Sequence, residues 1–159
     1  MTLTLSSPAF ANSGTIPEKY TCDGERELSP PLSIGGAPEG TKAFVLIMDD
    51  PDIPKEVKAS HGIEVFDHWT VYNIPPATRG IPEGATIGSA GLNGVGSEGY
   101  IGPCPPSQYE PREHRYIFAL YALRDVLHFN EPPTKQQVLD ALAPLLLAKT
   151  ELVGRYARG

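Results

Sequence analysis

The sequence has little cysteine and no long apolar run. Two cysteines in 159 residues are too few for a framework of several disulfides. No stretch approaches the ~20 apolar residues of a membrane-spanning helix. The N-terminus also lacks the basic start and apolar segment of a signal peptide. We therefore expect a cytoplasmic protein without a membrane span.

Basic residues are not in excess either, because the formal net charge is −6. General binding to nucleic acid or to anionic membranes needs a basic surface, so the sequence predicts no nucleic-acid partner. A local basic pocket remains compatible with this charge. Cysteine and histidine show no zinc-type spacing, and we expect no cofactor.

Proline and glycine are plentiful, with 17 and 16 copies, which is typical of a chain with many turns and short strands. The length is usual for one domain, and no repeat or linker interrupts it. We therefore interpret residues 1–159 as a single domain.

Three segments predict strong strands. Residues 42–48 are a continuous apolar run and indicate a strand buried on both faces. Residues 68–74 and 114–123 are rich in aromatic and β-branched residues. Weaker patterns predict a first strand around residues 3–5 and a last strand near the C-terminus.

One helix is expected, beginning after Thr134 as N-cap. Its apolar stripe has helical spacing and comprises Val138, Leu139, Leu142, Leu145 and Leu146. Several strands and one late helix favour a mainly β fold, an antiparallel β-sandwich with a peripheral C-terminal helix. The stripe could cover its own sandwich or a second copy, so a homodimer stays open.

Polar clusters stand at the ends of the three strong strands: residues 50–52, 67–68 and 114–116. Loops gather at strand ends and commonly carry sites. Because side chains alternate along a strand, His114 and Tyr116 share one face and Arg115 takes the other. Asp52 is a candidate partner for Arg115.

These clusters predict a small anion pocket. Asp50 beside a histidine would favour the charged imidazolium. His68, His114, the Tyr116 hydroxyl and backbone N–H groups of residues 99–104 would then bind phosphate or carboxylate.

Each element also has a simpler interpretation. His68 could be an ordinary strand-edge histidine, and Tyr116 a core tyrosine. The proline-rich loop that follows Tyr100 could merely cover a sheet edge. Cys104 in that loop could be an accessible thiol. A metal bound by His68, His114 and Asp50 is a further alternative.

Several motifs together resemble the phosphatidylethanolamine-binding protein family, and most closely its bacterial and archaeal branch of Raf-kinase-inhibitor-like proteins. The similarity extends over essentially the whole chain. The segments that carry it are Asp50-Pro51-Asp52-Ile53-Pro54, His68-Trp69, Gly102-Pro103-Cys104-Pro105-Pro106, His114-Arg115-Tyr116, Tyr20-Thr21-Cys22-Asp23-Gly24 and Ser29-Pro30-Pro31-Leu32.

The resemblance implies Greek-key connections and a surface pocket for small anions, including phosphorylated head groups. By motif position, the ligand-binding residues would be Asp50, His68, Gly102, Cys104, Pro105, Pro106, His114 and Tyr116. Asp52 and Arg115 would support the wall, and Phe66 would line the rim. The family pattern also makes Ile53–Pro54 a candidate cis peptide.

Two positions depart from the family pattern. Cys104 replaces a small residue and Ile34 replaces a tryptophan. Acidic residues of the segment 107–113 would weaken binding of large anionic ligands, so lipid binding is a weaker expectation than anion binding.

The leading interpretation is a non-enzymatic binding protein for a small anion or phosphorylated head group. The alternative is a regulatory inhibitor of a kinase or serine protease that uses the same pocket or its rim. A hydrolase is the third hypothesis, although the sequence places no activated nucleophile.

Overall fold

The computed structural model describes residues 2–159, which form two β-sheets with helices at their margins. The elements in chain order are β1 (Thr4–Ser6), β2 (Gly14–Thr15), η1 (Glu18–Tyr20), β3 (Leu32–Gly35), β4 (Ala43–Asp50), α1 (Lys55–His61), β5 (Phe66–Ile74), β6 (Gly80–Ile81), β7 (Ser89–Ala90), β8 (His114–Leu123), α2 (Lys135–Leu142), η2 (Ala143–Leu145) and β9 (Leu146–Tyr156).

The larger sheet has the strand order β2-β9-β8-β4-β5-β7. Three of its four inner strands, β8, β4 and β5, are those predicted most strongly. β8 has the predicted bounds, and the bounds of β4 and β5 differ from the predicted ones by one or two residues. β4 pairs antiparallel with both β5 and β8. β2, however, pairs parallel with β9, so the prediction of a wholly antiparallel fold is wrong at that edge.

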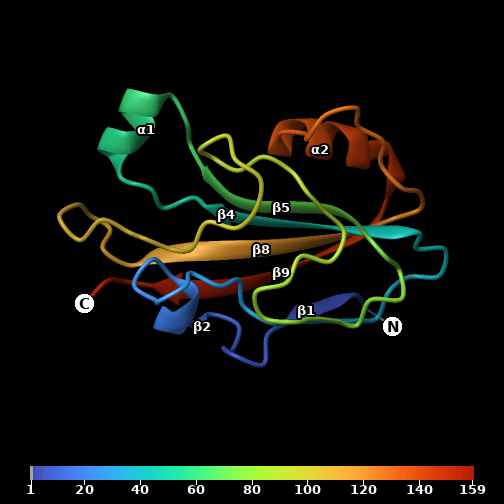
Figure 1. The fold of residues 1–159 in the computed structure, drawn as a ribbon, viewed down its shortest axis with the longest axis horizontal. Helices are drawn as coiled ribbons and strands as arrows, with labels where there is room; N and C mark the ends of the chain where they lie inside the picture. The colour runs from blue at the N-terminus through green and yellow to red at the C-terminus, as the bar shows by residue number, and fades with distance from the viewer. Residues whose placement is uncertain (1) are drawn as a thin grey trace.

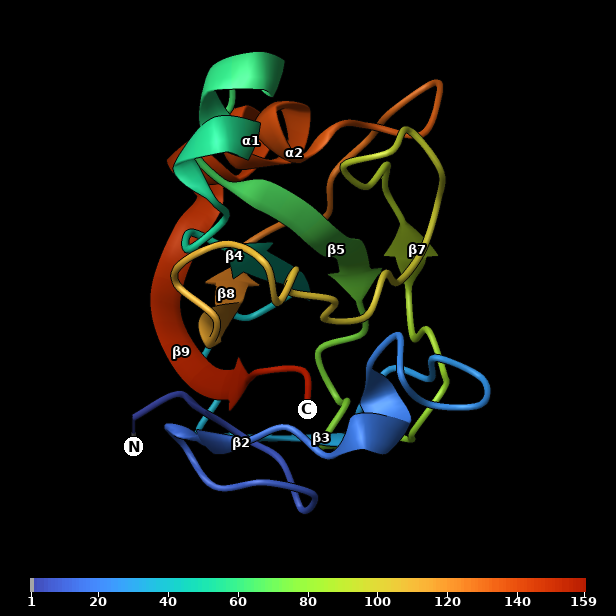
Figure 2. The ribbon, with the colours of Figure 1, turned by 90° about the vertical axis from the view of Figure 1, so that its left-hand side faces the viewer.

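The smaller sheet, β1-β3-β6, covers one face of the larger sheet, and α2 covers the other (Figure 1 and Figure 2). Alternation along β4 explains both layers. Phe44, Leu46 and Met48 belong to the core between the sheets. Val45 and Ile47 pack on the side of α2. Burial on both faces is what the apolar run 42–48 predicted.

α2 begins as predicted, because Thr134 and Gln137 form a reciprocal capping box. Val138 and Leu142 are buried against the helix's own sheet. Part of the stripe is therefore used within the chain, and a homodimer stays a prediction. The predicted stripe extends too far, since Leu146 already belongs to β9 and is exposed.

Two further expectations are corrected by the structure. α1 was not predicted, because none of its residues is buried and its sequence therefore has no apolar stripe. Its end is marked by Gly62, whose φ of 65° lies in the left-handed region that suits glycine. The cis peptide bond is Glu110–Pro111, not Ile53–Pro54.

The fold is thus mainly β with two α-helices. The Greek-key connectivity and the single-domain interpretation stay predictions. Within residues 2–159, no helix is both long and apolar enough to cross a membrane.

Candidate functional site

Three strand ends meet at one edge of the larger sheet. Asp50, the last residue of β4, pairs with Phe66, the first residue of β5. β8 also runs antiparallel to β4, so its first residue, His114, starts at the same edge. The antiparallel pairing of neighbouring strands therefore explains why polar residues distant in sequence converge.

A pocket of about 240 Å³ lies at this edge. It contains all eight residues that the sequence nominated for ligand binding, together with Phe66. Its walls are formed by Asp50, Ile53, Pro54, Val57, Phe66, His68, Ile101, Gly102, Cys104, Pro105, Pro106, His114 and Tyr116. The sequence did not nominate four apolar lining residues, Ile53, Pro54, Val57 and Ile101, because none of them carries a polar or ionisable side chain. Asp52 and Arg115 lie outside this lining.

His114 and Asp50 form a buried pair in the pocket wall. The Nδ1 atom of His114 lies 2.6 Å from Asp50 Oδ2, and its Nε2 atom lies 3.0 Å from the carbonyl oxygen of Pro111. Both ring nitrogens of His114 are therefore engaged inside the wall. This leaves no free ring N–H for a ligand, so the expectation that this ring donates to a ligand is wrong. The charging of His114 by Asp50 stays a prediction.

Asp50 is held on both of its oxygen atoms. While Oδ2 accepts from His114, Oδ1 accepts the backbone N–H of Asp52 at 2.8 Å. The proline between the two aspartates restricts the backbone of Asp50. The carboxylate is therefore fixed in position and paired with His114 inside the wall.

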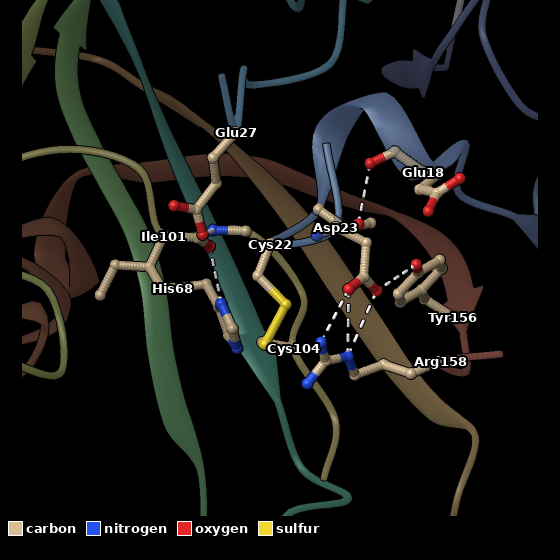
Figure 3. The surroundings of a disulfide bond; sticks show 11 residues. Glu18, Cys22, Asp23, Glu27, His68, Ile101, Cys104, Tyr156 and Arg158 are labelled. Carbon is tan, nitrogen blue, oxygen red and sulfur yellow. Dashed lines mark hydrogen bonds and ion pairs between the residues drawn. A yellow bond between two sulfur atoms is a disulfide. The ribbon is translucent and has the colours of Figure 1, made fainter. Parts of the chain in front are cut away.

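His68 is oriented by the loop that crosses in front of it. Its Nδ1 atom lies 2.7 Å from the carbonyl oxygen of Ile101 (Figure 3). Because a carbonyl only accepts, Nδ1 carries a proton. Burial lowers the pKa of His68 most strongly, and the nearby charge of His114 lowers it further, against opposing contributions from Ile101, Asp50 and Asp67. The ring is therefore neutral near pH 7.

Tyr116 is fully buried between the two histidines. Its ring packs edge-on against His68, with centroids 5.2 Å apart, and stacks on His114 at 6.2 Å. Its hydroxyl has no hydrogen-bond partner within residues 2–159. Burial raises its pKa, so the hydroxyl remains protonated and can donate. An unpaired buried hydroxyl costs free energy unless a ligand or a water molecule accepts its hydrogen bond.

The loop 100–106 supplies fewer amide donors than expected. Pro103, Pro105 and Pro106 have no N–H. The N–H of Ile101 donates to His68 O at 2.9 Å, and that of Gly102 donates to Glu27 Oε1 at 3.0 Å. Within the predicted row, residues 99–104, the amides of Ile101 and Gly102 are therefore used for holding the loop.

Gly102 is required at its position by close packing. A Cβ atom there would lie 2.8 Å from the backbone oxygen of Tyr20 and 2.9 Å from Cγ of Glu27. Glu27 is a contributor that the sequence did not reveal, because it lies 75 residues from the amide it binds.

A disulfide between Cys22 and Cys104 ties the pocket wall to the N-terminal segment, with the two Cα atoms 5.4 Å apart (Figure 3). The expectation of an accessible Cys104 thiol is therefore wrong. The pairing had no local signal, because 82 residues separate the cysteines. The backbone N–H of Cys22 also donates to Pro103 O at 3.0 Å.

Asp52 and Arg115 form the predicted pair beside the pocket. Arg115 donates from Nε and Nη2 to the two carboxylate oxygens, both at 2.8 Å, and its backbone N–H also donates to Asp52. The bidentate contact lowers the pKa of Asp52. The arginine side chain is 56% exposed, so the pair orients the two side chains more than it stabilises the fold.

The metal alternative finds no support in the geometry. Within the described residues, no three His, Cys, Asp or Glu side chains gather as metal ligands would. His114 has both ring nitrogens engaged and Nδ1 of His68 is also occupied.

Comparison with known proteins agrees with this architecture. The phosphatidylethanolamine-binding protein family matches residues 6–157. A UPF0098 protein of Methanothermobacter thermautotrophicus is 42% identical over 164 residues, which cover 99% of this chain and 100% of that protein. The crystal structure of a putative phosphatidylethanolamine-binding protein homologue from Chlamydia trachomatis is 40% identical, covers 99% of both chains and has a TM-score of 0.90.

Escherichia coli YbcL, described as a new member of the mammalian family of such proteins, superimposes with a TM-score of 0.84 at 26% identity over the whole of both chains. Sequence and structure thus give one answer: the chain belongs to the phosphatidylethanolamine-binding protein family.

Proposed function

We propose that the chain is a non-enzymatic binding protein that holds a phosphate-like group in the pocket between His68 and Tyr116. The observation that carries this proposal is Tyr116, which lines the pocket and whose buried, protonated hydroxyl has no hydrogen-bond partner within residues 2–159. A bound oxyanion would accept its hydrogen bond and remove the cost of leaving it unpaired.

The carboxylates around the pocket are paired. Asp50 is paired with His114, and Asp52 with Arg115. A ligand therefore meets no unpaired carboxylate in the wall. A pocket of this kind would bind a small anion through hydrogen bonds and fit, not through a strong field.

The size and the rim suit a phosphate with a short substituent. Since a water molecule takes about 30 Å³ in the liquid, the cavity of about 240 Å³ exceeds the need of a bare phosphate. Ile53, Pro54, Val57 and Phe66 make the rest of the wall apolar. Carbon atoms of a head group or of a modified side chain would pack there.

The direct test is calorimetric titration with phosphoethanolamine. Tyr116→Phe removes only the hydroxyl, and we expect about a ten-fold loss of affinity. Tyr121→Phe, on the same strand but outside the pocket lining, is the matched control and should bind normally. Equal affinity of the Tyr116→Phe variant and the native protein would contradict the proposal.

A regulatory role with a protein partner is the second candidate. A neighbouring hollow of about 670 Å³ shares Ile53 with the pocket. Charges of both signs line it, from Lys55, Lys58, Asp52, Glu56 and Glu110, together with the exposed Tyr109. A protein segment with a phosphorylated or acidic side chain in the pocket would continue into this hollow. If the protein still captures a kinase or protease in the presence of excess free phosphate, that partner does not bind through the pocket.

The hydrolase hypothesis is less well supported. Ser60 and His61 lie 2.9 Å apart, but Nδ1 of His61 also faces the carbonyl oxygen of Val57 at 3.3 Å. Adjacent and exposed on α1, they lie outside the pocket lining. We propose no reaction for them.

A further inference from the structure

The disulfide joins a firmly held segment to a loosely held one. On the side of Cys22, the next residue, Asp23, accepts a hydrogen bond from the Tyr156 hydroxyl at 2.6 Å and pairs with Arg158 at 2.8 Å (Figure 3). These contacts tie the turn around Cys22 to the end of β9. The position of Cys22 is therefore fixed by contacts other than the sulfur–sulfur bond.

On the side of Cys104, hydrogen bonds hold the loop only as far as Pro103. Each of residues 100–103 makes a hydrogen bond to a segment outside the loop. From residue 105 to residue 110, every hydrogen bond and ion pair that the described part of the chain contains stays inside the segment 105–112. The next attachment is the carbonyl oxygen of Pro111, which lies 3.0 Å from Nε2 of His114. Residues 104–111, called the flap below, thus have few contacts with the rest of the protein.

The flap is a wall that two hollows share. Its residues 104–106 line the pocket, and its residues 108–111 line the neighbouring hollow of about 670 Å³. Pro105 is the only buried residue of the flap. If the disulfide opened, the flap would be attached only through the packing of Pro105 and the contact at Pro111, so this wall would be free to move.

Exposure decides which sulfur a reductant reaches. Cys104 is exposed, whereas Cys22 is half-buried. A disulfide opens when a thiolate attacks one of its sulfur atoms and the other sulfur leaves. Because access limits that attack, Sγ of Cys104 is the atom that receives it, and Cys22 is the leaving group.

We infer that the disulfide is a redox-controlled latch on the flap, opened by a dithiol reductant that attacks Cys104. The first thiolate forms a mixed disulfide with Cys104 while the electron pair of the broken bond goes to Cys22, which takes up a proton. The second thiol of the reductant then displaces the Cys104 sulfur, which is protonated in turn. The protein gains two electrons and two protons, and the dithiol becomes a disulfide. This inference goes beyond the proposed function, because it holds whatever the pocket binds.

Reduction of the folded protein is the first test. The native protein is treated with dithiothreitol in the absence of urea, and the free thiols are alkylated and counted by mass spectrometry. Both cysteines should become free while fluorescence still reports a folded protein. With an excess of glutathione, a monothiol, the trapped mixed disulfide should lie on Cys104. A bond that opens only in urea, or an adduct on Cys22, would overturn the inference.

Limited proteolysis with chymotrypsin then measures the flap itself. Tyr109 is an exposed aromatic residue in the flap, and Phe118 is a fully buried one in β8. After reduction and removal of the reductant, cleavage after Tyr109 should be at least about ten-fold faster, since proteolysis follows the population of open forms. The Cys22→Ala/Cys104→Ala variant should be cleaved at the faster rate before and after the same treatment.

Two outcomes of the proteolysis would contradict the latch. Equal rates after Tyr109 in the oxidised and reduced proteins would mean that the packing of Pro105 holds the flap without the disulfide. An equal increase after Phe118 would mean that the bond stabilises the whole fold and has no particular effect on the flap. Neither outcome bears on the proposed function, which is tested by phosphoethanolamine binding to the oxidised protein.

Discussion

Removing the Cys22–Cys104 disulfide should lower the free energy of unfolding substantially. The bond closes a loop with a sequence separation of 82 residues. The chain-entropy relation for a loop of that length gives about 4.5 kcal/mol at 25 °C, and measured values are commonly 2–4 kcal/mol. Domains of this size have roughly 5–15 kcal/mol of total stability. The variant should therefore remain folded at low temperature with a clearly lower midpoint of unfolding.

The comparison uses Cys22→Ala/Cys104→Ala and the native protein with and without a dithiol reductant. Urea unfolding followed by fluorescence gives the free energy in each case. Reduction should destabilise the native protein and leave the variant unchanged, which separates loss of the bond from unrelated effects of the reductant. A loss of less than about 1 kcal/mol in the double variant would refute the reasoning from loop entropy.

Further predictions concern α2 and the ionisable groups. Thr134→Ala removes the capping box and should cost about 1 kcal/mol of unfolding free energy in urea. Lys135→Ala leaves Asp49 and Asp67 without the ammonium 3.1 and 2.7 Å away, and should cost about 2–3 kcal/mol, whereas Lys149→Ala at an exposed pair should cost little. His68 has a lowered pKa in the folded state, so the unfolded chain takes up a proton first as the pH falls below 6.5. Stability should decrease with falling pH in that window, less steeply in His68→Asn.

Much of the fold was accessible from local patterns. β8 was predicted to the residue, because ten residues of alternating, aromatic-rich sequence start at one polar cluster and end before another. α2 was identified by Thr134 and its apolar stripe. α1 and the parallel pairing of β2 with β9 were not predicted. A helix with no buried residue and a strand of two residues leave almost no pattern in the sequence.

The convergence of site residues was predictable for the same reason. Antiparallel neighbours put the end of one strand beside the start of the next, so polar residues at those ends meet. Which atoms face a ligand was not predictable. The roles of His68 and His114 are decided by the carbonyl oxygens of Ile101 and Pro111, and apolar residues give no sign in the sequence of where their carbonyls point.

The two histidines therefore have different chemistry despite their similar positions at strand ends. His114 has both ring nitrogens engaged inside the wall, by Asp50 and by the carbonyl oxygen of Pro111. His68 gives one ring nitrogen to the loop, and the other has no hydrogen-bond partner among the described residues 2–159. A substitution of His114 should consequently disturb stability and binding together, because it leaves the buried Asp50 unpaired. A substitution of His68 that keeps the bond to Ile101 should change ligand binding with little loss of fold. Measuring both the unfolding curve and the phosphate affinity of each variant distinguishes these two roles. An equal loss of stability in both variants would show instead that the two rings share one structural role.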